Sequence, residues 1–449
     1  MKKLLFAGLC SLVILSASAT CGAMEIIKDK LTVNGTAKVW GVSIDNRDFD
    51  SDSNDDDTSW FGQQFRMATK YTVNENVSVH FRMDYSDGVW GKDFDNWNEG
   101  WADANEDAEL EIDRAYILLK KGITTVTVGQ HWNGAGPNYI IWDQQSTGVT
   151  LDLDLPVHIK LNYSKIDEGS SLTDSSNITV DLDGDGVAES GSEDLDFFGA
   201  DFSYHTETSA IHLTFATRDD KSSADLSPWG VGIVGTTKMG DVSLNLELDQ
   251  FGGSHGNLDV VGTQVFADLG IKKGNISSGV MGVFATGTDD TANEIQYNSV
   301  SAGSWSFDPF DWEGAMRWNY PPLLMGAKGQ FDMLGQLASP VPGLDLVNGY
   351  DKDSVWGGNS TGSRGICPYI RYTPNESWFM YGKIIYQTPN QDENTVIESL
   401  LGLTAGVDYT FFGGSTTFSL GAMCVKPEFE DDRNEDTLIN LMTQLRVNF

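Results

Sequence analysis

Residues 242–249 read Val-Ser-Leu-Asn-Leu-Glu-Leu-Asp, so apolar side chains at even positions alternate with polar side chains at odd positions. Successive side chains of a β-strand point to opposite faces, and this period of two therefore predicts a strand with one apolar and one polar face. The same alternation recurs in residues 76–86, 156–165 and 437–449. Outward from these stretches, about 18 such segments follow one another along the chain as far as Phe449.

The expected strands are separated by connections of two kinds. Connections after even-numbered strands are short and contain Gly, Asn, Pro and Asp, as hairpin turns require, whereas those after odd-numbered strands run from about nine to nearly eighty residues. We expect the strands at residues 31–44, 60–72, 76–86, 109–119, 123–132, 146–154, 156–165, 195–204, 209–217, 229–239, 241–250, 260–270, 276–285, 364–373, 377–387, 402–412, 414–424 and 437–449.

This rhythm is typical of a closed barrel that crosses an outer membrane. The sequence predicts an all-β fold, a transmembrane antiparallel β-barrel of about 18 strands, with 16 as the alternative count, short periplasmic turns and long extracellular loops. A ring of this size is too wide for side chains to fill, so its interior must be wet. The apolar face of each strand must then meet lipid.

The first 23 residues have the pattern of an export signal. Two lysines precede an apolar run at residues 4–15, and small residues follow, with cleavage expected after Ala19 or Ala23. Residues 24–449 then form a single barrel domain, because no linker and no shift from strand to helix patterning divides them.

The chain is strongly acidic, with a formal net charge of −36. This charge argues against nucleic acid as a partner, because phosphate binding needs a basic face. Most of the acidic residues lie in the long connections, for example at residues 50–57 and 428–432. They are interpreted either as solvated loops or as sites for divalent cations that bridge the protein to an anionic cell surface.

Two further stretches resemble the general bacterial porins. Residues 114–136, RAYILLKKGITTVTVGQHWNGAG, are similar to the family's strand, glycine turn and strand that precede its constriction loop, and residues 438–449, LINLMTQLRVNF, resemble the C-terminal assembly signal. The resemblance implies a non-enzymatic, water-filled channel for passive diffusion of small hydrophilic solutes and ions. It also implies a homotrimer in the Gram-negative outer membrane, in contact with its lipid and lipopolysaccharide, with no required cofactor.

The resemblance also implies a pore constriction. Arg114 should point into the lumen, and the loop from about Trp132 to Gln145 should fold inward and narrow the pore. Arg66 and Arg82 occupy inward positions on the preceding strands, and Asp143 of the loop is expected to face them, which would create a transverse field. The alternative is an ordinary set of lumen cations paired with wall acids, namely Asp84, Asp113 or Glu111.

Two other functions remain open at this point. The channel is substrate-selective if inward aromatics such as Tyr369, Phe197 and Phe266 form a slide for sugars, or if the arginines select anions. Alternatively, the chain is a surface-structural or adhesive barrel whose lumen is plugged by the long, aromatic-rich connection at residues 286–363. Ion selectivity is also open, because the acidic mouth should gather cations while the arginines favour anions.

Residues 181–189 resemble the front half of a calcium loop, with alternate acids followed by glycine at the sixth position. The candidate ligands for calcium are Asp181, Asp183, Asp185 and Glu189. A turn-rich acidic loop without a metal is the alternative, since position twelve is serine and flanking helices are not expected.

The six histidines have no metal-ligand spacing, and no nucleophile-elbow or haem-attachment sequence occurs. Inward histidines such as His80, His158 and His212 are therefore expected to be wet lumen residues, and no enzymatic activity is predicted.

Overall fold

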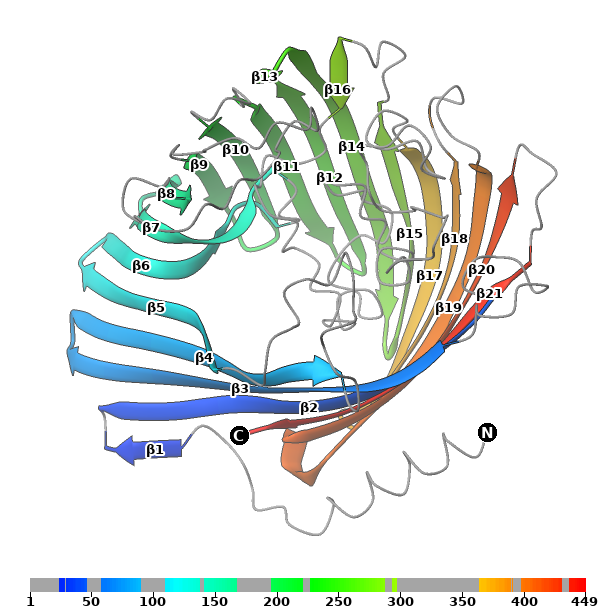
Figure 1. The fold of residues 1–449 in the computed structure, drawn as a ribbon, viewed down its shortest axis with the longest axis horizontal. Coiled ribbons are helices and arrows are strands. Elements are labelled where there is room, and N and C mark those ends of the chain that lie inside the picture. Colours follow the sequence, from blue (N-terminus) through cyan, green and yellow to red (C-terminus); the bar gives the residue numbers. More distant parts are fainter. Residues whose placement is uncertain are drawn as a thin grey trace, which may run out of the picture.

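The computed structural model describes residues 24–28, 30–46, 58–89, 110–137, 141–167, 195–220, 227–286, 293–296, 363–388, 390, 397–429 and 436–449. These residues form a closed antiparallel barrel of 18 strands (Figure 1). Its strands are β2 (Leu31–Asp45), β3 (Thr58–Asn74), β4 (Val77–Val89), β5 (Leu110–Lys121), β6 (Thr124–Gly134), β7 (Asp143–Leu153), β8 (His158–Asp167), β9 (Leu195–His205), β10 (Ser209–Asp220), β11 (Trp229–Met239), β12 (Val242–Gly252), β14 (Leu258–Lys273), β15 (Ile276–Ala285), β17 (Ser363–Asn375), β18 (Trp378–Thr388), β19 (Ile397–Phe411), β20 (Thr416–Phe429) and β21 (Leu438–Asn448). No described segment is a helix with the length and hydropathy needed to span a bilayer.

Each of the 18 expected segments coincides with one of these strands, and the count of 18 rather than 16 is confirmed. Each strand pairs with its sequence neighbours, and the ring closes where β2 pairs with β21 from Thr36 and Asn448 to Asp45 and Ile439. Three further short strands extend it: β1 (Met24–Ile27) pairs with the start of β2, and β13 (Ser254–His255) and β16 (Glu294–Gln296) both pair with β14. A short 3₁₀ turn, η3 (Phe412–Gly414), joins β19 to β20.

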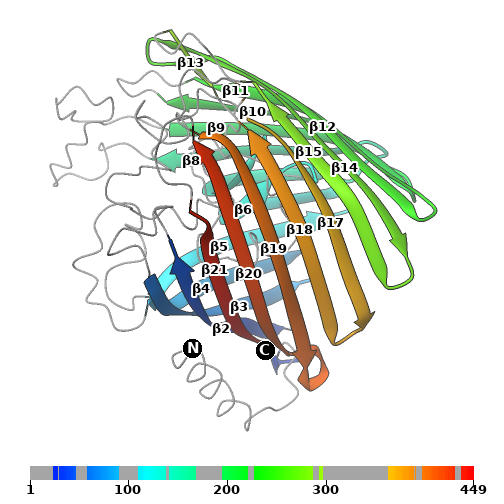
Figure 2. The ribbon, with the colours of Figure 1, turned by 90° about the vertical axis from the view of Figure 1, so that its right-hand side faces the viewer.

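The strands are tilted and are joined by tight turns at one end of the barrel (Figure 2). Two of these turns place Gly122 and Gly274 at φ values of 60° and 59°, in the left-handed region that favours glycine. At the seam, the backbone of Phe449 exchanges hydrogen bonds of 2.8 and 3.0 Å with Gly35, and its ring stacks on Phe65 at 5.5 Å. The C-terminal residue therefore fastens the first barrel strand to the last.

The apolar side chains face outward. On β10, Ile211, Leu213 and Phe215 are 41–53% exposed, whereas the alternate residues Thr214 and Ala216 are at most 2% exposed. Ile233 on the neighbouring strand β11 is 51% exposed in the same outward row. An outer face of this kind suits a barrel that spans a membrane, and the predicted assignment of faces is confirmed.

Candidate functional site

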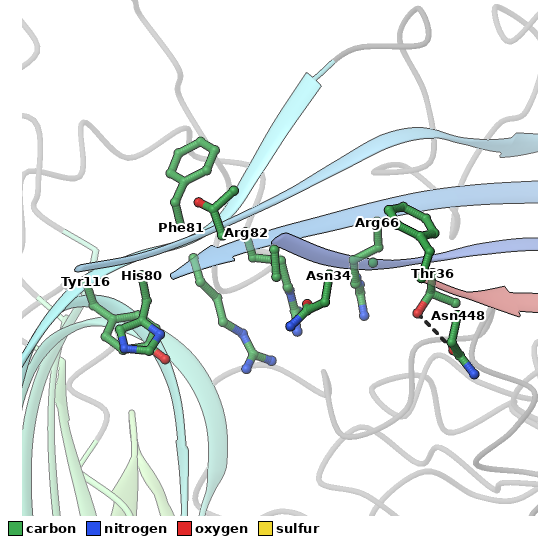
Figure 3. A pocket seen from close by; sticks show the side chains of 13 residues that line it. Asn34, Thr36, Arg66, His80, Phe81, Arg82, Tyr116 and Asn448 are labelled. Atoms are coloured by element: carbon green, nitrogen blue, oxygen red, sulfur yellow. Dashed lines mark hydrogen bonds between the residues drawn. The ribbon is translucent and has the colours of Figure 1, made fainter. Parts of the chain in front are cut away.

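Arg66, Arg82 and Arg114, which we call the arginine ladder, lie on the inner wall of three adjacent strands, β3, β4 and β5. They line a recess of about 390 Å³. Figure 3 shows Arg66 and Arg82 extending to the same side of the sheet as Asn34, whereas Phe81 points the other way. The other polar residues around the recess are Thr36, Thr69, His80, Tyr116 and Asn448. The period of two thus brings the three predicted arginines together.

A β-bulge adds an acid to this group. Arg82 pairs with Arg114, but Met83 pairs with Ile112, so Asp113 is an extra residue in β5. A bulge places two consecutive residues against one on the partner strand and disturbs the alternation of faces. Asp113 is only 5% exposed and forms ion pairs with Arg82 and, at 3.7 Å, with Arg114. The bulge therefore inserts a carboxylate between two arginines.

The third arginine is paired across the strands. Arg66 Nε donates to Asp84 Oδ1 and Oδ2 at 2.7 and 2.9 Å, and its Nη2 forms an ion pair with the same carboxylate. Three guanidinium groups thus share two wall carboxylates, and the side chains of Arg66 and Arg114 remain 29% and 28% exposed. Among the described side chains of this group, guanidinium groups outnumber carboxylates by one. Asp84 and Asp113 were both expected as partners under the wall-pairing alternative.

Two described residues between β6 and β7, Ile141 and Trp142, lie against the inner wall, and we call them the strap. The other described residues between these strands are 135–137. Trp142 is fully buried over Gly199 of β9, so close that an added Cβ would lie 2.7 Å from the indole ring. Ile141 lies over Gly232 of β11 in the same way, at 2.8 Å. The two glycines provide the space in which the strap lies on the sheet.

Side chains from three strands contact Trp142. Trp142 Nε1 donates to Asn133 Oδ1 at 2.5 Å, and its ring lies 5.7 Å from the ring of Phe197. Lys160 Nζ donates to the carbonyl oxygen of Gly134 at 2.6 Å and lies 5.5 Å from the centre of the Trp142 ring. These contacts join Trp142 to β6, β8 and β9, so that the described part of the strap is held by the barrel wall.

Of residues 132–145, which were expected to fold inward and narrow the pore, Ile141 and Trp142 lie against the inner wall, and the narrowing itself stays a prediction. Trp132 belongs to β6, and Asp143 begins β7, where its backbone pairs with Gly134. The side chain of Asp143 lies outside the described residues, so its role opposite the arginines stays a prediction. The candidate calcium ligands, Asp181, Asp183, Asp185 and Glu189, also lie outside the described residues.

Acidic side chains lie on the opposite wall, a feature that the sequence analysis did not identify. Glu247 and Asp249 of β12 and Asp268 of β14, which we call the acidic wall, are nine strands away from β3 and β4 in the ring of 18 (Figure 1). Along their strands, Arg66 lies eight residues from the short-turn end of β3, and Asp249 lies seven residues from that of β12. Glu247 and Asp249 are 4% and 0% exposed, and Asp268 accepts a hydrogen bond from Tyr369, so these carboxyl groups lie within the wall opposite the ladder.

The inward aromatic residues do not offer free faces to a solute. Phe197 and Phe266 are 0% and 3% exposed, and Phe197 packs against Trp142. Tyr369 is 8% exposed, donates a hydrogen bond to Asp268 at 2.9 Å and has the guanidinium of Arg371 5.1 Å from its ring centre. Stacking of sugars on these three rings, as the sugar-slide alternative requires, is therefore not supported by their burial.

No protein-family model matches the sequence, and no curated protein matches it. Solved structures do share the fold. A BenF-like porin from Pseudomonas fluorescens Pf-5 superimposes with a TM-score of 0.56 at 12% identity, over 95% of this chain and 100% of that one. OccAB4 from Acinetobacter baumannii gives 0.55 at 13% identity, over 94% and 98% of the two chains.

The outer-membrane protein OpdK from Pseudomonas aeruginosa, solved with vanillate, gives a TM-score of 0.55 at 9% identity, over 95% of this chain and 100% of that one. At such low identities the likeness establishes the fold alone. The chain thus shares its barrel, over nearly its whole length, with structures that include a porin and an outer-membrane protein.

Proposed function

We propose that the protein is an outer-membrane channel through which small hydrophilic solutes and ions diffuse. The observation that carries this proposal is the reversal of faces: apolar side chains cover the outside of an 18-strand ring, while the arginine ladder projects inward. Such a ring is too wide to be filled by its own wall side chains and has a wet interior. A barrel of this fold has no need of a catalytic group to carry out its role.

In the same proposal, the export signal is removed by cleavage after Ala19 or Ala23. The barrel then assembles as a homotrimer in the Gram-negative outer membrane, among its lipids and lipopolysaccharide. The short turns then lie in the periplasm and the long connections outside the cell. The arginine ladder and the acidic wall produce a field across the lumen that orients dipolar solutes. At physiological salt the Debye length is about 8 Å, so these nearby lumen charges outweigh the acidic loops in setting ion selectivity.

Reconstitution into planar bilayers tests the proposal. Purified protein should insert in discrete conducting steps, and reversal potentials in a salt gradient should shift toward cation selectivity in Arg82→Ala, because a lumen cation is lost. A folded barrel that never conducts would contradict the proposal and favour the plugged, surface-structural alternative.

A selective channel for small anions is the second candidate, favoured by the positive excess of the ladder and by its recess of about 390 Å³. Arginine binds carboxylates through two parallel hydrogen bonds, and OpdK, which shares the fold, was solved with vanillate. Vanillate should therefore interrupt the current, whereas vanillin, which has an aldehyde in place of the carboxylate, should not. Arg66→Ala should weaken the interruption; equal effects of the two solutes would reject selectivity while leaving the diffusion channel intact.

A further inference from the structure

Two histidines that are not adjacent in the sequence meet on the inner wall near the short-turn end. His205 ends β9, and His212 lies in β10, beyond the turn that joins the two strands. Ala210 pairs with His205 and Ser203 with His212, so the two histidines are diagonal neighbours on one face of the hairpin. Their ring centres are 5.0 Å apart and the ring planes are perpendicular, at 86°.

A carboxylate orients one of these imidazoles. His212 Nδ1 lies 3.2 and 3.3 Å from the two carboxylate oxygens of Asp201, which is 4% exposed and also accepts a hydrogen bond from Thr214 Oγ1 at 2.9 Å. Histidines that bind metals nearly always donate their other ring N–H to a carboxylate, carbonyl or water in this way. The contact leaves Nε2 of His212 available to a ligand.

The second imidazole is more exposed. His205 Nε2 forms a hydrogen bond of 3.1 Å with Ser203 Oγ, and its Nδ1 has no hydrogen bond among the described residues. Two imidazoles on the same ion, each with a metal–nitrogen distance of about 2.0–2.1 Å, place their nitrogens roughly 3 Å apart. Rings whose centres are already 5.0 Å apart reach that spacing by small side-chain rotations.

We propose that His205 and His212 form a two-imidazole site that binds a divalent transition ion, of the class of Ni²⁺ and Zn²⁺, on the lumen wall, with water completing the coordination. Imidazole nitrogen suits these ions, whereas Mg²⁺ and Ca²⁺ prefer oxygen ligands. Among the described residues no group of three His, Cys, Asp or Glu side chains is arranged to hold a metal. The site therefore has two protein ligands, and Asp201 acts only through His212.

Equilibrium dialysis with Ni²⁺ on the full, detergent-solubilised barrel tests the proposal. Excess Mg²⁺ should be present, because the chain has 65 acidic residues whose carboxylates would otherwise bind part of the Ni²⁺. The wild type should bind one Ni²⁺ per chain above the level of the double variant His205→Ala/His212→Ala. His205→Gln should lose this ion as well, and since it keeps a hydrogen-bonding group beside Ser203, its fold should be intact by circular dichroism.

His158→Ala is the matched control. His158 begins the neighbouring strand β8, opposite Ser203, and lies 3.7 Å from Asp152. This variant should keep the Ni²⁺, and loss of binding here would overturn the two-histidine assignment. Wild-type binding equal to that of the double variant would overturn it too. None of these measurements requires the barrel to conduct, so either result leaves the proposed channel function untouched.

Discussion

Removal of the Trp142 side chain should detach the strap from the barrel wall. The indole is fully buried, and its partners are Gly199 and Phe197 on β9, Asn133 on β6 and Lys160 on β8. Truncation of a buried tryptophan to alanine costs about 3–5 kcal/mol. At about 1.4 kcal/mol per tenfold change, Trp142→Ala should shift the equilibrium between seated and detached strap by a hundredfold to a few thousandfold.

Single-channel recording is the assay. A detached strap enters and leaves the lumen, so the current of Trp142→Ala should show more noise and brief partial closures than that of the wild type. Trp132→Ala is the control, because this tryptophan is nearby on β6 but 37% exposed on the outer face. If Trp142→Ala forms a folded barrel whose current is as quiet as that of the wild type, the strap does not affect the width of the pore, and the reasoning is refuted.

Other substitutions test the glycine that the strap lies on, the charges of the arginine ladder and the candidate calcium site. Gly232→Val should reproduce the current noise of Trp142→Ala, because the added Cβ would lie 2.4 Å from a carboxylate oxygen of Asp249 and 2.8 Å from Ile141. Gly235→Val is the control and should leave the current unchanged, because an added Cβ there meets open space. Asp113→Asn removes a carboxylate from the ladder and should shift the reversal potential toward anions; a shift toward cations would contradict the charge assignment. Calcium calorimetry should give heat with the wild type and none with Asp183→Asn, and the absence of heat from the wild type at millimolar calcium would end the calcium hypothesis.

Most of the fold was predictable from the alternation of apolar and polar side chains along the sequence. Because a one-residue slip would turn a strand's apolar side chains into the lumen, the period of two predicts both the strands and their faces. It also placed Arg66 and Arg82 on the inner wall, whereas the inward position of Arg114 was implied by the resemblance to the general porins. Strand ends were less predictable: β7 begins at Asp143, so a residue expected in the inward loop belongs to a strand.

The missed features depend on local irregularity, on relations between strands that are distant in sequence, or on the register of a hairpin. The bulge at Asp113 breaks the period on which the prediction relied. The acidic wall lies opposite the ladder because β12 and β14 are nine strands away from β3 and β4, respectively. This relation exists only once the strands close into a ring. His205 and His212 meet because a hairpin register places them on a diagonal, and their separation in the sequence resembles no metal-binding spacing.

Labelling of two adjacent residues with a charged thiol reagent tests the central claim most directly. Tyr116 lines the recess beside the arginine ladder, and Ile117 is 45% exposed on the outside of the same strand, β5. The barrel is reconstituted in lipid in a background in which Cys21, Cys367 and Cys424 are serine. We predict that Tyr116→Cys reacts with the charged reagent, whereas Ile117→Cys reacts only with a lipid-soluble one. The reverse pattern would mean that the apolar side chains line the interior, and the assignment of a wet lumen would be wrong.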